Sequence, residues 1–113
     1  MQKDELKKHH CVPCEGGTAP LNEEEENNYY SATPSWELQR KEVPHTLRKD
    51  FSFKNFVEAM KFVSKVGELA ESEGHHPDFH IFYNKVKLEL YTHAIKGLSE
   101  NDFIMAVKID ELV

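Results

Sequence analysis

The stretch FKNFVEAMKFVSKVGELAESEG (residues 53–74) decides the fold, because it carries the strongest helical repeat in the chain. Apolar residues that recur at intervals of three and four are typical of an amphipathic α-helix with one wide apolar face. We expect this helix over residues 53–73, capped by Ser52 and ended by Gly74 in a left-handed conformation. Its predicted apolar face comprises Phe53, Phe56, Val57, Met60, Val63, Val66, Gly67 and Ala70. Gly67 costs about 1 kcal/mol against alanine in a helix interior, which close packing on a sheet would explain.

The segments on both sides of this helix alternate between apolar and polar residues, as β-strands with one buried face do. The pattern predicts two antiparallel pairs. The strands are residues 36–43, 46–53, 79–83 and 86–93, with turns at Pro44-His45 and Asn84-Lys85.

Two further helices complete the prediction. Residues 21–30 form one, capped by Asn22, and its acidic run from Glu23 to Glu26 suits the positive end of a helix dipole. Ser99 caps the last helix, which has Asp102 in its first turn. This order of elements predicts an α+β fold, in which a four-stranded antiparallel sheet has helices packed on one face and an open polar second face.

The length of 113 residues fits one domain, for which we expect residues 21–113, preceded by an irregular N-terminal arm at residues 1–20. The hydrophobic share of 39% and the charged share of 30% are ordinary for a globular chain. The net charge of -6 does not favour nucleic-acid binding. No apolar run approaches the ~20 residues that cross a bilayer, and no secretory signal follows the first lysines, so we expect a cytoplasmic protein.

Cys11 and Cys14 form a C-x-x-C spacing, which can be redox-active or half of a zinc site. No second such pair exists, and His9 and His10 would crowd a tetrahedron made within six residues. We expect two reduced, inert thiols, with a structural metal as the alternative.

Four of the seven histidines follow the long helix: His75, His76, His80 and His93. An imidazole titrates near ~6.5, so several around one pocket supply both an acid and a base at neutral pH. Carboxylates of Glu71 and Asp78 could orient these rings. No nucleophile is paired with the histidines, which favours proton transfer without a covalent intermediate.

A metal site made by His75, His76, Asp78 and His80 is the alternative reading of this cluster. Adjacent side chains diverge, however, and the H-E-x-x-H spacing is absent. For His80 alone we favour an idle loop residue. His93 is expected on the open face of the sheet, at the end of the strand, where the loop after the long helix would bring His75 and His76 to it.

The residues match the pattern of a known family. Its motif has an acidic residue, a His-His-Pro triplet, an aromatic residue, a later histidine and a closing aspartate, here Glu71, His75-His76-Pro77, Tyr83, His93 and Asp102. The stretches FKNFVEAMKFVSKVGELAE (residues 53–71), YNKVKLELYTHAIKGLSENDF (residues 83–103) and CEGGTAPL (residues 14–21) carry the likeness outward. Over residues 11–112 the sequence resembles the pterin-4a-carbinolamine dehydratases, also called 4a-hydroxytetrahydrobiopterin dehydratases.

The resemblance implies removal of water from a 4a-hydroxytetrahydropterin to give quinonoid dihydropterin, in recycling of the pterin cofactor of aromatic amino acid hydroxylases. It implies catalysis by His75, His76 and His93, with no metal and no organic cofactor. The substrate-binding residues that it implies are Glu71, Pro77, Asp78, Phe79, Tyr83, Thr92 and Asp102. Phe79 stands where many members have tryptophan, so an aromatic wall is expected without an indole donor.

The resemblance also implies the same α+β fold and a homodimer or homotetramer, with dimers formed by sheet extension. Some animal members serve as dimerization cofactors of a transcription factor. A protein-binding module of this coactivator type, without essential catalysis, is therefore the alternative function.

Overall fold

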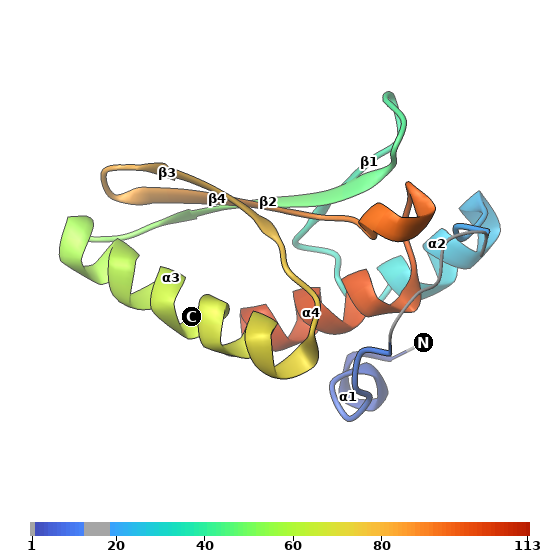
Figure 1. Ribbon diagram of the computed structural model, residues 1–113, viewed down its shortest axis with the longest axis horizontal. Helices are drawn as coiled ribbons and strands as arrows, with labels where there is room; N and C mark the ends of the chain where they lie inside the picture. The colour runs from blue at the N-terminus through green and yellow to red at the C-terminus, as the bar shows by residue number, and fades with distance from the viewer. Residues whose placement is uncertain (1, 13–18) are drawn as a thin grey trace.

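The computed structural model describes residues 2–12 and 19–113 and shows a sheet covered on one face by helices (Figure 1). The sheet is antiparallel and four-stranded, in the order β1-β2-β4-β3. The strands are β1 (Glu37–Gln39), β2 (Thr46–Ser52), β3 (Asp78–Phe82) and β4 (Lys85–Leu90). The helices are α1 (Lys3–Leu6), α2 (Glu23–Tyr30), α3 (Phe56–Glu73) and α4 (Glu100–Asp110). The predicted α+β class and sheet are confirmed.

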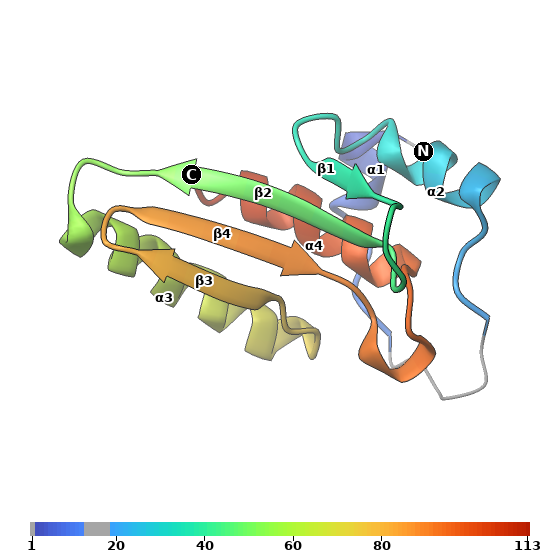
Figure 2. The same ribbon diagram turned by 90° about the horizontal axis from the view of Figure 1, so that it is seen from above.

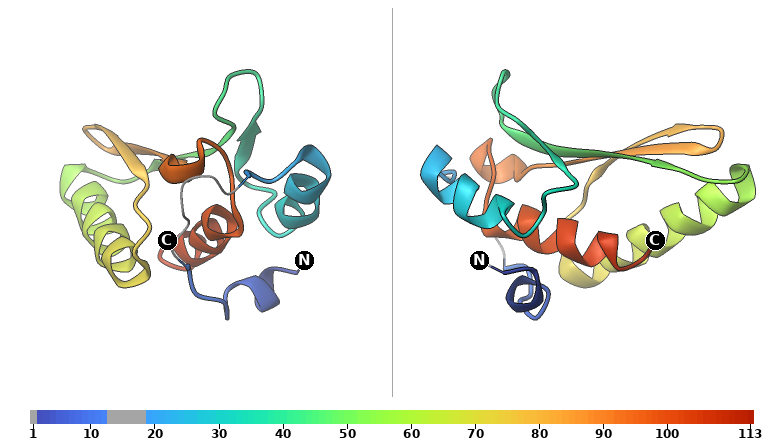
Figure 3. Two further views of the ribbon diagram at one scale, coloured as in Figure 1. Left: turned by 45° about the vertical axis from the view of Figure 1, so that its right-hand side comes forward. Right: turned by 180° about the vertical axis from the view of Figure 1, so that it is seen from behind.

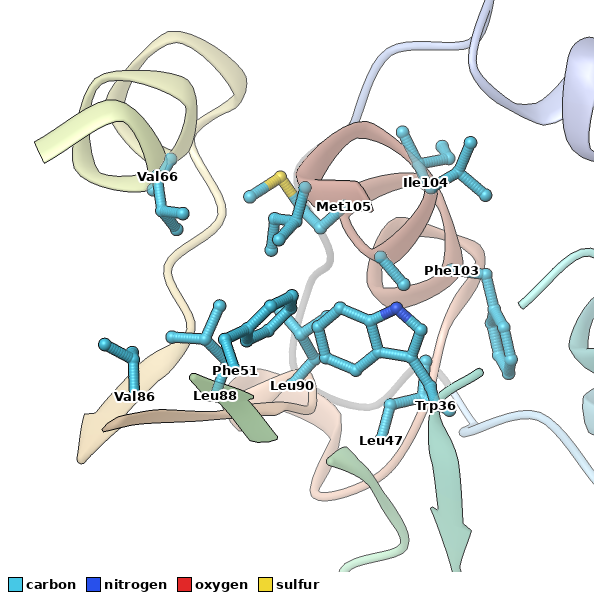
Figure 4. Close-up of a cluster of buried hydrophobic side chains, with 14 of the residues drawn as sticks. Trp36, Leu47, Phe51, Val66, Val86, Leu88, Leu90, Phe103, Ile104 and Met105 are labelled. Carbon is cyan, nitrogen blue, oxygen red and sulfur yellow. The ribbon is translucent and has the colours of Figure 1, made fainter. Parts of the chain in front are cut away.

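The core lies between the sheet and the two longer helices. In the central β2–β4 pair, Leu47 lies opposite Leu90 and Phe51 opposite Val86, so alternate side chains face the helices. Figure 4 shows these side chains pointing towards those of α3 and α4. Burial of such side chains supplies the main driving force for folding, about 1.5–3 kcal/mol for each large one.

The long helix is confirmed, but its start and its buried face differ from the prediction. It begins at Phe56, because the Asn55 side chain, and not Ser52, caps it by accepting a hydrogen bond from the Glu58 N–H at 2.9 Å. Phe56 and Val57 are 47% and 59% exposed. The segment has more apolar residues than one face can bury, and packing against the sheet selects a stripe that shares only Val66 and Ala70 with the predicted face. That stripe is Ala59, Phe62, Val66 and Ala70.

The two glycines of this segment have different roles. Gly74 ends α3 with φ +66°, the left-handed conformation expected of it. A Cβ added at Gly67 would meet nothing within 4 Å. The expectation that close packing on the sheet requires Gly67 is therefore wrong.

The strands are shorter than predicted at several ends. β4 stops at Leu90, and His93 instead begins a short 3-10 helix, His93–Ile95. The Thr92 backbone pairs with Gly97 in an isolated bridge that closes the loop around this short helix, while the Thr92 hydroxyl bonds to Ser99 and Asp102. β1 covers only part of residues 36–43, and β3 begins one residue early, at Asp78.

The helix α4 is the most buried element. Every residue from Asn101 to Val107 is buried, because α4 lies between the sheet on one side and the N-terminal arm on the other (Figure 3). The arm is therefore not irregular throughout: it forms α1 and buries Leu6 completely. In the described ranges, no helix has both the length and the apolar character needed to span a membrane.

Candidate active site

Two segments distant in sequence meet at one end of the sheet. Asp78 at the start of β3 pairs with Glu89 near the end of β4. Because the strands are antiparallel, the loop that enters β3 and the loop that leaves β4 lie at the same end (Figure 2). They line a cavity of about 430 Å³. Its lining residues are Val12, Gly74, His75, His76, Pro77, Asp78, Thr92, His93, Ala94 and Asn101.

His75 is the most firmly held of the three histidines. Its Nε2 lies 2.6 Å from Oδ1 of Asp102, a fully buried carboxylate. The other oxygen of Asp102 accepts bonds from the Thr92 hydroxyl at 2.9 Å and the Ser99 N–H at 3.0 Å. A carboxylate so placed favours a proton on Nε2 of His75, which leaves Nδ1 as the nitrogen that can accept one.

The His76 ring pairs with the carboxylate of Glu71 and not with that of Asp102. Its Nε2 pairs with Glu71 on the last turns of α3, and both side chains are exposed. Water screens such a pair, so it orients the ring more weakly than Asp102 orients His75. Glu71 does not line the cavity and reaches it only through His76.

His93 reaches the cavity from the other segment. Its Nε2 lies 4.0 Å from Oδ1 of Asp78, so the β3 start and the loop after β4 approach each other through these two side chains. The His93 ring also contacts Tyr91, with ring centroids 4.1 Å apart. Tyr91, which follows the last residue of β4 and packs partly against the core, was not among the predicted site residues.

Neither of the two aromatic residues expected in the site lines the cavity. Phe79 pairs with Leu88 and therefore faces the helices, where it packs against the core. The expected aromatic wall is thus absent from the cavity. Tyr83 is 68% exposed in the turn at the far end of β3 and stacks on Phe56. A five-residue strand separates it from the cavity by about 15 Å.

Four lining residues were not predicted for the site: Val12, Gly74, Ala94 and Asn101. Asn101 precedes Asp102 in α4, and Val12 comes from the N-terminal arm. The segment His9–Val12 is 89 to 91 residues away in sequence from the α4 residues that it contacts. No local pattern indicates such a contact.

Among the described residues, no three His, Cys, Asp or Glu side chains are arranged to hold a metal ion. His75 pairs with Asp102 and His76 pairs with Glu71, so the two rings point to different carboxylates. Nε2 of His80 lies 3.6 Å from Oε1 of Glu89. Cys14 lies outside the described residues, so the C-x-x-C pair cannot be placed. Burial raises the pKa of Cys11 to about 12, which keeps this thiol protonated and a poor nucleophile.

Known proteins resemble this chain along most of its length. The profile of the family described as Pterin 4 alpha carbinolamine dehydratase matches residues 19–112. A relative from Methylococcus capsulatus is 51% identical over 102 residues, which is 90% of this chain and 88% of the relative. One from Rubrobacter xylanophilus is 44% identical over 108 residues, 96% of this chain and 98% of the relative. Both are provisionally named pterin-4-alpha-carbinolamine dehydratase.

Solved structures agree. A transcriptional coactivator/pterin dehydratase from Brucella melitensis superposes with a TM-score of 0.75 at 31% identity, covering 82% of this chain and 97% of that one. A pterin dehydratase-like protein identified as a RuBisCO assembly factor in the alpha-carboxysome gives 0.59 at 26% identity, covering 69% and 88%. The chain therefore belongs to the pterin-4a-carbinolamine dehydratase family.

Proposed function

We propose that this protein is a 4a-hydroxytetrahydrobiopterin dehydratase, a carbon–oxygen lyase that converts 4a-hydroxytetrahydropterin into quinonoid dihydropterin and water. The observation that supports it most is the placement of His75, His76 and His93 around one cavity of about 430 Å³. Small-molecule sites commonly measure about 300–1,000 Å³, so a bicyclic pterin fits the available space.

The reaction is a pair of proton transfers around one bond cleavage. The C4a–O bond breaks, and the hydroxyl group takes a proton from an imidazolium and leaves as water. The N5 proton goes to a neutral imidazole, and the N5 electron pair forms the new C4a=N5 double bond. One histidine loses a proton and another gains one, so the enzyme as a whole is unchanged. No electron enters or leaves, and the chemistry needs no metal and no organic cofactor.

The three histidines differ in how they are supported. His75 is nearly buried, and Asp102 fixes its orientation, so it acts from a fixed position. His76 and His93 are exposed beside the carboxylates of Glu71 and Asp78. Water reaches both rings, so they can exchange protons with solvent between turnovers. This combination of a fixed ring and two exchanging rings suits a reaction that needs an acid and a base in each cycle.

The substrate-binding residues are the remaining groups at the cavity. Thr92 holds Asp102 in place, and Pro77 restricts the backbone between His76 and Asp78. Phe79 and Tyr83, which the family resemblance implies for this role, do not line the cavity within one chain.

The cellular role that we propose follows from the reaction product. Quinonoid dihydropterin is the form that a reductase returns to tetrahydropterin, so the protein would work beside an aromatic amino acid hydroxylase in the cytoplasm.

Self-association is part of the proposal. The outer edge of β3 has no strand partner in the described part of the chain, and unpaired edges favour pairing with another strand. Exposed apolar side chains gather at the adjoining hairpin and helix start: Phe56, Val57, Ile81, Phe82 and Tyr83. We propose a homodimer or homotetramer. Light scattering coupled to gel filtration tests it, and a monomer at micromolar concentration contradicts it.

A protein-binding role is the second candidate. The same exposed apolar side chains favour it, and two solved structures similar to this chain are described as a transcriptional coactivator/pterin dehydratase and as a RuBisCO assembly factor. A triple variant, His75→Ala, His76→Ala and His93→Ala, separates the two functions. It retains any effect exerted through a partner and loses any effect that depends on dehydration.

The direct test is a kinetic assay with freshly generated 4a-carbinolamine. The proposal predicts that the protein accelerates formation of quinonoid dihydropterin over the uncatalysed rate and that a chelator leaves the rate unchanged. A rate equal to the uncatalysed one contradicts it.

A further inference from the structure

The N-terminal arm reaches the candidate active site, although the family profile begins only at residue 19. Val12 lines the same cavity as the three histidines. Four successive residues of the arm, His9 to Val12, contact two helix ends, and Cys11 contacts both. These ends are the C-terminus of α3, which leads into His75, and the first turn of α4, which carries Asp102.

The firmest contact is a double hydrogen bond between Val12 and Asn101. The Val12 N–H donates to Oδ1 of Asn101 at 3.0 Å, and Nδ2 of Asn101 donates to the Val12 carbonyl at 2.6 Å. Asn101 is buried and sits beside Asp102 on α4. These two bonds therefore fix the position of the Val12 backbone relative to Asp102, the carboxylate that orients His75.

Glu73 holds the preceding residues from the other helix. Its Oε1 accepts the Cys11 N–H at 2.8 Å, and its Oε2 pairs with Nδ1 of His10 at 3.1 Å and with Nζ of Lys108 at 2.8 Å. Since Glu73 is two residues before His75, the same helix end positions the arm and the histidine.

The cavity needs an apolar surface that the predicted residues do not provide. The pterin substrate is a bicyclic ring system whose faces are less polar than its edges, yet the expected aromatic wall is missing because Phe79 faces the core. The lining is mostly polar, and its larger apolar side chains are those of Val12, Pro77 and Ala94. Val12 is 65% exposed, so its side chain is accessible to a ligand.

We propose that the arm segment His9–Val12 is a substrate-binding wall of the pterin cleft. In this inference, which rests on the proposed dehydratase function, Val12 contacts the pterin. Asn101 and Glu73 are positioning residues that hold Val12 there. The arm is thus a part of the active site that the family domain alone does not supply.

The test compares steady-state kinetics of Val12→Ala with wild type. Loss of an apolar contact made equally in the ground and transition states raises KM by about three- to tenfold and leaves kcat within about twofold. Val43→Ala, an exposed valine outside both the cavity and the proposed association surface, is the control and keeps the wild-type KM.

Asn101→Ala tests the positioning role and has a readout that does not depend on activity. The thiol of Cys11 lies 3.6 Å from the Asn101 carbonyl and is half buried, so it reports whether the arm is docked. In a Cys14→Ser background, Asn101→Ala increases the rate of Cys11 modification by a disulfide reagent at least about tenfold. It raises KM as Val12→Ala does, and the double variant Val12→Ala/Asn101→Ala shows no further increase, because both changes remove one contact.

The outcomes separate the two claims. An active wild type whose KM is unchanged by Val12→Ala overturns the arm inference and leaves the dehydratase function standing. Additive KM increases in the double variant overturn the positioning role of Asn101. An inactive wild type overturns the proposed function and the arm inference with it.

Discussion

Nε2 of His75 lies 2.6 Å from Oδ1 of Asp102, and this contact joins the loop after α3 to the first turn of α4. The other oxygen of Asp102, Oδ2, accepts hydrogen bonds from the Thr92 hydroxyl and from the Ser99 N–H at the N-terminus of α4. One buried carboxylate thus supports the helix start and the orientation of the imidazole together.

Asp102→Asn should reduce kcat by about ten- to a hundredfold, since an amide cannot hold the His75 ring as a carboxylate does. It should also lower the free energy of unfolding by about 1–3 kcal/mol through weakened buried hydrogen bonds. Kinetics and urea unfolding of the same preparation measure both effects.

Asp110→Asn is the matched control for this change. Asp110 bonds to Lys49 and to the Trp36 indole at the other end of α4, away from the cavity. It should lose a similar free energy of unfolding and keep the wild-type kcat. Equal losses of kcat in both variants would mean that Asp102 acts on activity only through stability.

Glu73 should make stability depend on acid pH. Burial raises its pKa, but bonds from Lys108, the Cys11 N–H and His10 lower it further, to about 2 from 4.5. The unfolded chain therefore binds more protons than the folded one between these values. The stabilisation is complete above pH 4.5 and is lost as the pH falls towards 2, on the order of 1 kcal/mol after allowance for solvent screening.

Urea unfolding between pH 6 and pH 3 measures this dependence, as ~0.5-unit steps in pH resolve a proton-linked slope. Glu73→Gln should flatten it, whereas Glu24→Gln, the same charge change at an exposed position of α2, should retain it. An identical slope in wild type and Glu73→Gln contradicts the assignment.

Gly67→Ala should stabilise the protein. The position is inside α3, and the added Cβ meets nothing within 4 Å, so the gain in helix propensity of about 1 kcal/mol is retained. For a domain of this size the midpoint of thermal unfolding should rise by about 4–8 °C. Gly74→Ala should do the opposite because of its positive φ. A lower midpoint for Gly67→Ala would show that α3 packs more closely than described.

The sequence predicted the parts of this structure that depend on local pattern. The alternation of Val86, Leu88 and Leu90 with polar residues predicts the strand β4. Gly74 predicts the end of α3, and therefore a loop that contains His75 and His76. The register of β3 with β4 then brings His93 to that loop, as the antiparallel arrangement requires.

What the sequence did not predict depends on contacts between distant segments. The buried stripe of α3 contains Val66 and Ala70 as predicted, but packing against the sheet adds Ala59 and Phe62 and leaves Phe56 and Val57 exposed. Phe79 was expected in the site, but its pairing with Leu88 turns it to the core. The bond between Val12 and Asn101 spans 89 residues of chain, so nothing near either residue indicates it.

The central claim is that His75, His76 and His93 move protons around one bound pterin. Steady-state kinetics of the three single alanine variants with freshly generated carbinolamine test it most directly, with His80→Ala as the control histidine outside the cavity. The account predicts that each of the three variants loses about 10²–10⁴-fold in kcat with an unchanged circular dichroism spectrum, while His80→Ala keeps the wild-type rate. Wild-type rates in all three variants would contradict it.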